Sequence, residues 1–224
     1  MRRMLNRLLA WVSGAPAQPA SPEGPRAPGP APSAVLSLPM APPAGGGPPL
    51  DLAETLRAHR QWVETGGKEG RRAELAGRPL RLASLFMANL RGAGLRGANL
   101  QRAEIQWADL GGADLAGADL SGADLFQSNL EGTRLTGASL REAGLLSANA
   151  AGADLEGADL EGADLRGAGL GGARLAGARL ARADLRGADL SGARGLSPEQ
   201  LALALTDDST RLPGGLAPGG GEGR

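Results

Sequence analysis

Residues 111–125 read GGADLAGADLSGADL, so Ala and Leu each recur every five residues. A period of five matches neither the 3.6-residue turn of an α-helix nor the two-residue alternation of a β-strand. The same phase extends outward: from 75 to 190, every fifth residue is Leu except Ile105 and Ala150. Each repeat therefore offers one large and one small apolar residue, separated by polar residues or Gly. This pattern predicts a solenoid, in which the chain turns a corner at every repeat and stacked coils share a continuous core.

The apolar positions of the repeat are expected to point inward. Ala at the small position lets opposite walls approach closely, which leaves no lumen for a ligand, and we expect no cofactor. The central Leu residues would form the core, with these as markers: Leu115, Leu120, Leu125, Leu155 and Leu160.

Over residues 73–195 the repeat resembles the A(D/N)LXX motif of the pentapeptide-repeat proteins. The resemblance implies an all-β solenoid: a right-handed quadrilateral β-helix with one repeat per side, four per coil and about six coils. The leader LRAHRQWVETGGKEGRRAEL (56–75) and the ending GLSPEQLALALTDDSTRLPGGL (195–216) are also similar to those of a bacterial group in this family. Most members of that group have no assigned activity, so the resemblance predicts the fold and leaves the function open.

Composition divides the chain into six segments that differ in Pro, Gly, charge and periodicity. They are a basic amphipathic segment (1–12), a disordered Pro/Gly-rich linker (13–50), a helical N-terminal cap (51–72), the β-helix (73–195), a helical C-terminal cap (196–212) and a disordered tail (213–224).

Helix-start signals lie on both sides of the repeats. Asp51 with a Glu three residues later predicts a helix over 51–65, and Ser197 followed by Pro and Gln predicts one over 197–205. We expect His59 and Trp62 to pack the first helix onto the first coil. Because an uncovered solenoid end exposes Leu and invites stacking, the two helices are predicted to be caps. A homodimer through a rod end is the alternative.

Residues twenty apart would lie above one another on a coil of four repeats. One face then collects every aromatic residue of the repeats, with an acidic edge formed by Glu104, Asp124, Asp164 and Asp184. Coverage by the cap, chance, or a partner could explain this face, and exposed contiguous apolar surface favours a partner. We call its apolar members the aromatic stripe: Phe86, Met87, Trp107, Phe126 and Leu146.

Several chemistries have little support in the sequence. The chain has no Cys, one His and a formal net charge of zero. A thiolate site is excluded, a metal site is not predicted, and no nucleophile or phosphate-loop motif is present. An enzyme would have to be built around His59, for which packing is the competing explanation. We therefore expect a protein that is not an enzyme.

The first twelve residues, MRRMLNRLLAWV, mix Arg with apolar residues. Three interpretations stay open: a helix that makes weak contact with a membrane surface, an export signal, or an unstructured tail. The expected location is cytoplasmic, with attachment to a membrane surface or export as alternatives.

These observations predict an interaction or scaffold module, a rigid rod that binds a protein partner not identified by the sequence. The alternatives are a DNA-mimicking protein that binds and protects DNA gyrase, and a structural protein tethered to a membrane surface. Gyrase-protecting family members are strongly acidic, whereas residues 73–195 carry 15 acidic residues and 13 Arg, a net charge of −2. We expect no direct binding to nucleic acid.

Overall fold

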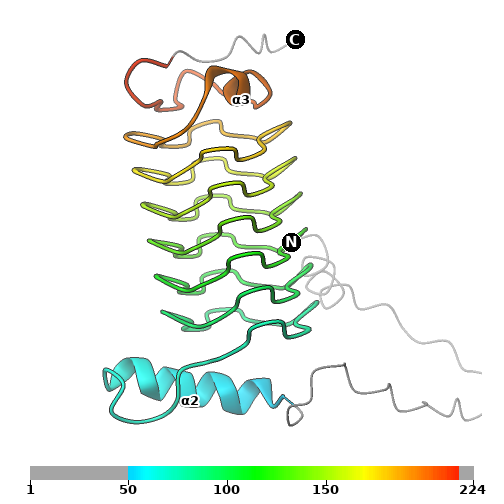
Figure 1. Cartoon of the computed structure of the whole chain (residues 1–224), viewed down its shortest axis with the longest axis vertical. Helices are drawn as coiled ribbons and strands as arrows, with labels where there is room; N and C mark the ends of the chain where they lie inside the picture. Colours follow the sequence, from blue (N-terminus) through cyan, green and yellow to red (C-terminus); the bar gives the residue numbers. More distant parts are fainter. Residues whose placement is uncertain (1–49, 217–224) are drawn as a thin grey trace, which may run out of the picture. The chain divides into compact units, whose positions relative to one another are not determined.

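The computed structural model describes residues 50–216. The described residues form one compact unit, a stack of coils with α2 (Leu52–Glu64) across one end and α3 (Pro198–Ala202) at the other (Figure 1). The predictions for the N-terminal basic segment, for nearly all of the linker, and for the tail beyond 216 lie outside the described residues.

The coils are joined by parallel β-bridges between residues twenty positions apart, throughout 74–194. At one such position the Leu120 N–H donates to the Ser139 carbonyl (2.7 Å), and the Asp119 N–H donates to the Ala98 carbonyl (2.9 Å). Because twenty residues hold four repeats, each coil has four sides. Only one residue per repeat forms a bridge, so the sides are too short to be continuous strands.

A tight turn closes each side. In the repeat at Leu115 the Ala118 N–H donates to the Leu115 carbonyl (3.0 Å), across Ala116 and Gly117. The φ of Gly117 is +66°, in the left-handed region that the third residue of a type II turn requires. The repeat therefore needs a residue at this position that tolerates positive φ, and Gly does so at the least cost.

The core consists of the repeated Leu and Ala side chains. Leu115, Leu120, Leu125, Leu155 and Leu160 are at most 2% exposed. Ala150, which replaces a Leu, is buried as well. Two polar residues that replace the core Ala are also buried, and each satisfies its hydroxyl on a backbone carbonyl: Ser128 on Leu125 (2.9 Å) and Thr133 on Leu110 (2.8 Å).

Helix α2 begins as its sequence predicts. The Asp51 carboxylate accepts the Glu54 N–H at 2.9 Å, which satisfies one of the free donors of the first turn. Leu52 and Leu56 are partly buried and pack against the core of the coils, and α2 lies across this end of the stack (Figure 1).

His59 joins α2 to the first coil. Its side chain is fully buried and stacks on Trp62, with ring centroids 5.5 Å apart. Its Nδ1 accepts the Ala73 N–H at 3.1 Å, so the proton of the neutral ring lies on Nε2. Protonation of Nδ1 would break this bond, which makes the neutral imidazole part of the contact.

The C-terminal end differs from the predicted helix over 197–205. The capping box of Ser197 and Gln200 is present, but α3 ends at Ala202. Leu205 and Arg211 then form parallel bridges with the last coil. Leu201 and Ala204, on either side of the helix end, are both buried. The residues after the helix also pair with backbone groups that the last coil would otherwise leave free, so an added partial coil is favoured over a longer helix.

Within residues 50–216, neither helix has the length and apolar character needed to cross a membrane.

We predict that the stability of the folded unit falls in mild acid because of His59. Burial of the ring is the largest cause, and it lowers the pKa of His59. The positive charge of Arg72 also lowers this pKa, whereas a hydrogen bond with the Arg91 backbone and the negative charge of Glu74 raise it by less. In the unfolded chain this pKa is about 6.5, so below that pH the unfolded state binds a proton that the folded state does not. The free energy of unfolding should therefore fall as the pH is lowered through about 6.5, as followed by urea unfolding and circular dichroism. In His59→Gln this dependence should disappear, and an equal slope in both proteins would contradict the assignment.

Candidate partner-binding surface

The aromatic side chains of the stripe form one continuous ladder over three coils. Trp107 meets Phe86 edge to face, with centroids 5.3 Å apart and planes at 78°. It meets Phe126 in the same manner on its other side, at 5.2 Å and 86°. The indole Nε1 donates to Gln127 Oε1 at 2.7 Å, which fixes the orientation of the ring. Edge-to-face pairs each add about 0.5–1.5 kcal/mol beyond burial, so the ladder is preorganised.

This ladder is open to solvent. Phe86 is 50% exposed, Met87 65% and Trp107 47%, while Phe126 and Leu146 are half-buried. The structure therefore brings together the residues of the aromatic stripe and leaves their outer faces uncovered within the described part of the chain.

The stripe is built on strained backbone. Eight described residues other than Gly have positive φ, and all lie two positions after the central Leu or Ile of a repeat, where Gly normally stands. They occupy two neighbouring sides of the coils. The side that includes Leu80 carries Leu82, Arg102, Glu142 and Arg182, and the side that includes Leu85 carries Met87, Trp107, Gln127 and Ser147. Left-handed backbone at such residues costs on the order of 1 kcal/mol each. Since these side chains project outward, core packing does not repay this cost, and a role at the surface is favoured.

Leu82 is a further exposed apolar residue on left-handed backbone, which the repeat pattern alone does not identify as a site residue. It is 60% exposed, with φ of +61°, on the side that precedes the stripe in the same coil. The available signal was a bulky residue at the position that Gly usually holds.

The four predicted edge carboxylates line one column beside the stripe, joined by bridges along the coils. They have two kinds of environment. Arg166 binds Asp164 through Nε (2.8 Å) and Nη2 (2.7 Å), and Arg186 binds Asp184 in the same way (2.8 and 2.5 Å). These bonds to Arg166 and to Arg186 are the largest causes that lower the pKa values of Asp164 and Asp184.

The other two edge carboxylates lie among the aromatic residues. Asp124 accepts hydrogen bonds from neutral donors, Gln106 Nε2 (2.7 Å) and the Phe126 N–H (3.0 Å). No ion pair to Asp124 or Glu104 occurs within residues 50–216. Their negative charge is therefore not compensated by the described protein.

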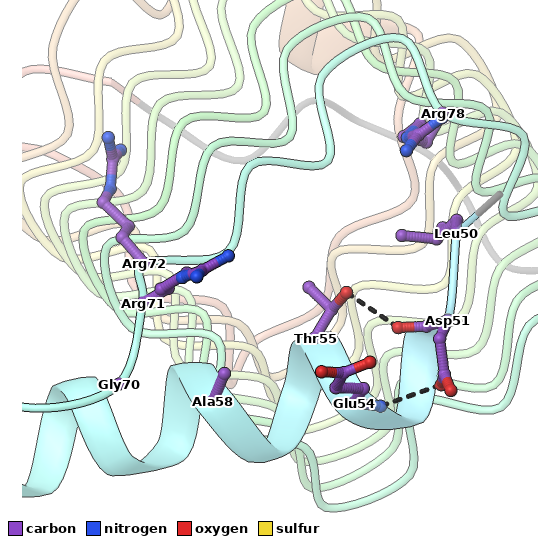
Figure 2. Close-up of a pocket in the computed structure, with 9 residues that line it drawn as sticks. All are labelled: Leu50, Asp51, Glu54, Thr55, Ala58, Gly70, Arg71, Arg72 and Arg78. Carbon is purple, nitrogen blue, oxygen red and sulfur yellow. Dashed lines mark hydrogen bonds between the residues drawn. The ribbon is translucent and has the colours of Figure 1, made fainter. Parts of the chain in front are cut away.

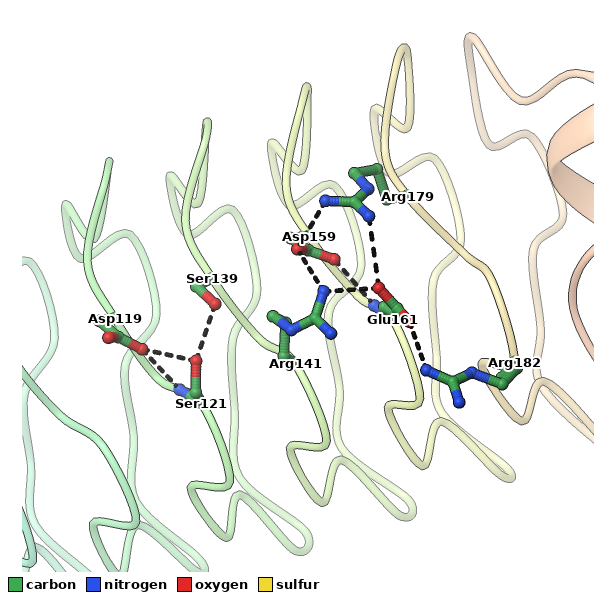
Figure 3. A network of polar contacts seen from close by, with 8 residues as sticks. All are labelled: Asp119, Ser121, Ser139, Arg141, Asp159, Glu161, Arg179 and Arg182. Atoms are coloured by element: carbon green, nitrogen blue, oxygen red, sulfur yellow. Dashed lines mark hydrogen bonds and ion pairs between the residues drawn. The ribbon is translucent and has the colours of Figure 1, made fainter.

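Elsewhere on the coils, charges pair across neighbouring rungs. Arg134 contacts Asp114 at 3.2 Å, and Arg174 contacts Asp154 at 3.1 Å. A second network joins Arg141, Arg179 and Arg182 to carboxylates on the adjacent coil, most of them on Glu161 (Figure 3). The bond from Arg141 is the main cause that lowers the pKa of Glu161. Exposed pairs of this kind add a few tenths of a kcal/mol each, so they maintain register and do not form a reactive site.

A cavity of about 550 Å³ lies between α2 and the first coil (Figure 2). Its lining carries both signs of charge, from Asp51, Glu54, Arg71 and Arg72 among others. Arg72 is engaged by the Gly92 carbonyl (2.6 Å) and by Glu74, and Asp51 caps α2. Two of its charged side chains are therefore already engaged within the protein.

The geometry offers no acid–base pair at His59, whose Nδ1 is committed to the backbone and whose ring is buried. Among the described residues, no group of three or more His, Asp or Glu side chains is placed to hold a metal ion.

Comparison with known proteins identifies the repeat. The family model for pentapeptide repeats matches with eight copies, over residues 80–117, 103–141, 118–157, 145–180 and 158–194. No curated protein matches the chain.

Three solved structures illustrate the similarity. A pentapeptide repeat protein from the thylakoid lumen of Arabidopsis thaliana is 33% identical over 40% of this chain and 63% of its own, with a TM-score of 0.39. HetL, which is involved in the regulation of heterocyst differentiation in a Nostoc cyanobacterium, is 35% identical over 63% and 73%, with a TM-score of 0.19. QnrB1, a plasmid-mediated fluoroquinolone resistance protein, is 23% identical over 60% and 72%, with a TM-score of 0.45.

We predict that relief of backbone strain in the stripe column raises stability. Ser147 has a φ of +56° and an exposed side chain, so Ser147→Gly should raise the free energy of unfolding by about 0.5–1 kcal/mol. Gly157 is the matched control, with a φ of +65° and no atom within 4 Å of an added Cβ. Gly157→Ser should lower stability by a similar amount in urea unfolding. Equal and small effects of both substitutions would show that the left-handed backbone costs little here.

Proposed function

This chain belongs to the pentapeptide-repeat family, and from that premise we propose that it is a non-enzymatic interaction module. Its coils act as a rigid scaffold that presents the aromatic stripe to a protein partner.

The observation that carries this proposal is the ladder of Phe86, Trp107 and Phe126. It is ordered by ring contacts and by the Trp107–Gln127 hydrogen bond, yet remains exposed. Large aromatic side chains fixed before binding lose little conformational entropy on association, and Trp is enriched at the centres of protein interfaces. The strained backbone below Met87 and Trp107 supports the same interpretation, because Gly would be the more stable choice there.

A DNA-mimicking protein that protects gyrase is the alternative. Such a role calls for a surface of continuous negative potential. Along the column of Asp114, Arg134 and Asp154 the charge alternates in sign, and Arg134 pairs with Asp114. This pattern favours the protein-interaction role over the mimic.

The test is quantitative co-purification from cells that naturally contain the protein. Phe86→Glu/Phe126→Glu should reduce the recovery of a specific partner at least tenfold, because charge enters the centre of the interface. Ala116→Glu/Thr136→Glu is the matched control, since these residues follow Leu115 and Leu135 on another side of the coils. It should leave recovery unchanged, and circular dichroism should show both variants folded. A partner retained equally by both variants would refute the stripe as the binding surface.

The finer description of the scaffold is part of this proposal: a right-handed β-helix of about six coils, closed by helical caps at both ends. It is supported by the burial of Leu52 and Leu56 against the core, and by Gln200 Nε2, which donates to the Leu175 and Ala178 carbonyls (2.9 and 2.7 Å). These contacts cover Leu side chains and occupy backbone acceptors at the ends of the stack.

If α2 is a cap, Leu56→Glu should release it and cause association through the exposed end. Sedimentation velocity should then show dimers or larger species, whereas Ala53→Glu, which adds the same charge at an exposed position of α2, should stay in the state of the unmodified protein. No change in either variant would argue that α2 does not prevent stacking.

A further inference from the structure

We propose that the segment bound by the aromatic stripe is cationic and apolar, with Arg or Lys next to large apolar side chains. This inference rests on the proposed function, because it names the chemistry of the partner at that surface.

The argument begins with one column of four carboxylates. Asp164 and Asp184 are each held by an Arg two residues later, in two-point contacts. Glu104 and Asp124 occupy the same position in earlier coils and have no ion pair within residues 50–216. The column is thus internally neutralised at one end and negatively charged at the other.

The residue after the central Leu decides between these two states. It is Arg166 or Arg186 where the carboxylate is neutralised, and Gln106 or Phe126 where it is not. The chain therefore replaces its own cation by aromatic and amide side chains over the coils where the apolar residues are exposed. A partner segment with cationic and apolar side chains would supply the positive charge that Arg166 and Arg186 supply in the later coils, and would also cover the exposed apolar residues.

The free carboxylate is also held in place. Asp124 accepts bonds from Gln106 Nε2 (2.7 Å) and from the Phe126 N–H (3.0 Å), both neutral donors that orient it without cancelling its charge. It lies in the column next to the ring ladder, so one guanidinium can pair with the carboxylate while an apolar neighbour covers the rings. An Arg can in addition stack on an aromatic ring. An anionic lipid surface has the wrong charge for this edge, which favours a protein segment.

The experiment uses full-length protein and a fluorescein-labelled peptide of about twelve residues that alternates pairs of Leu and Arg. Fluorescence anisotropy gives its affinity at low and at physiological salt. Two comparison peptides replace Arg by Gln or Leu by Ser. Glu104→Gln/Asp124→Asn removes the free charges, and Asp164→Asn/Asp184→Asn is the matched control, because it removes two carboxylates from the same column outside the stripe.

We expect Glu104→Gln/Asp124→Asn to weaken binding of the Leu/Arg peptide roughly tenfold and to reduce its salt dependence, at about two- to fivefold for each exposed charge. The control variant should change affinity less than twofold, and both comparison peptides should bind more weakly. Equal loss in the two variants, or equal binding of the Gln peptide, would overturn the inference. So would stripe-dependent binding to phosphatidylserine vesicles.

The proposed function can be separated from this inference by Phe86→Glu/Phe126→Glu. If this variant loses the co-purified partner while Glu104→Gln/Asp124→Asn retains it, the stripe binds protein but does not select cationic segments. In that case the interaction role stands and the inference fails.

Discussion

The structure depends on the pairing of each coil with the next through backbone hydrogen bonds at a fixed separation of twenty residues. Nearly every central Leu donates its N–H to the following coil, as Leu120 does to Ser139 at 2.7 Å, and buries its side chain at the same point. An isolated pentapeptide cannot bury its Leu, so stability arises only when coils stack. A slip of one residue would place polar side chains in the core at every level, which explains why the repeat tolerates so little variation in phase.

This constraint separates the demands on the inside from those on the outside. The core accepts a Ser or Thr in place of Ala only because Ser128 and Thr133 find carbonyl partners. Outside, the main restriction is the left-handed residue of each turn. Gly fills it on two sides in every coil, while the two sides that carry Leu82 and the stripe depart from it repeatedly. Left-handed backbone thus coincides with exposed apolar side chains at Leu82, Met87 and Trp107.

Membership of the pentapeptide-repeat family accounts for the core and the turns, and these features are shared by any such repeat. Three features depart from the regular repeat: the ring ladder, the strained residues below it and the contrast between paired and unpaired carboxylates in one column. A repeat fold alone specifies no function, so we look for function in these departures from the repeat. The same reasoning explains why His59, although it is the sole imidazole, belongs to the packing of α2.

The five-residue period by itself predicted a solenoid and the inward positions of the repeat. The residues that share a face followed only once the family resemblance supplied four repeats per coil, a register that the bridges between residues twenty apart confirm. The sequence also predicted where both helices begin, since Asp51 and Ser197 are local signals. Only the tertiary structure decided where α3 ends, because free backbone groups and burial on the last coil competed with local helix propensity. It likewise decided that Trp107 bridges two Phe rings, that Leu82 is exposed and strained, and that Asp164 is neutralised while Asp124 is not. These outcomes depend on side-chain conformations and distances between coils, which a periodic sequence does not specify.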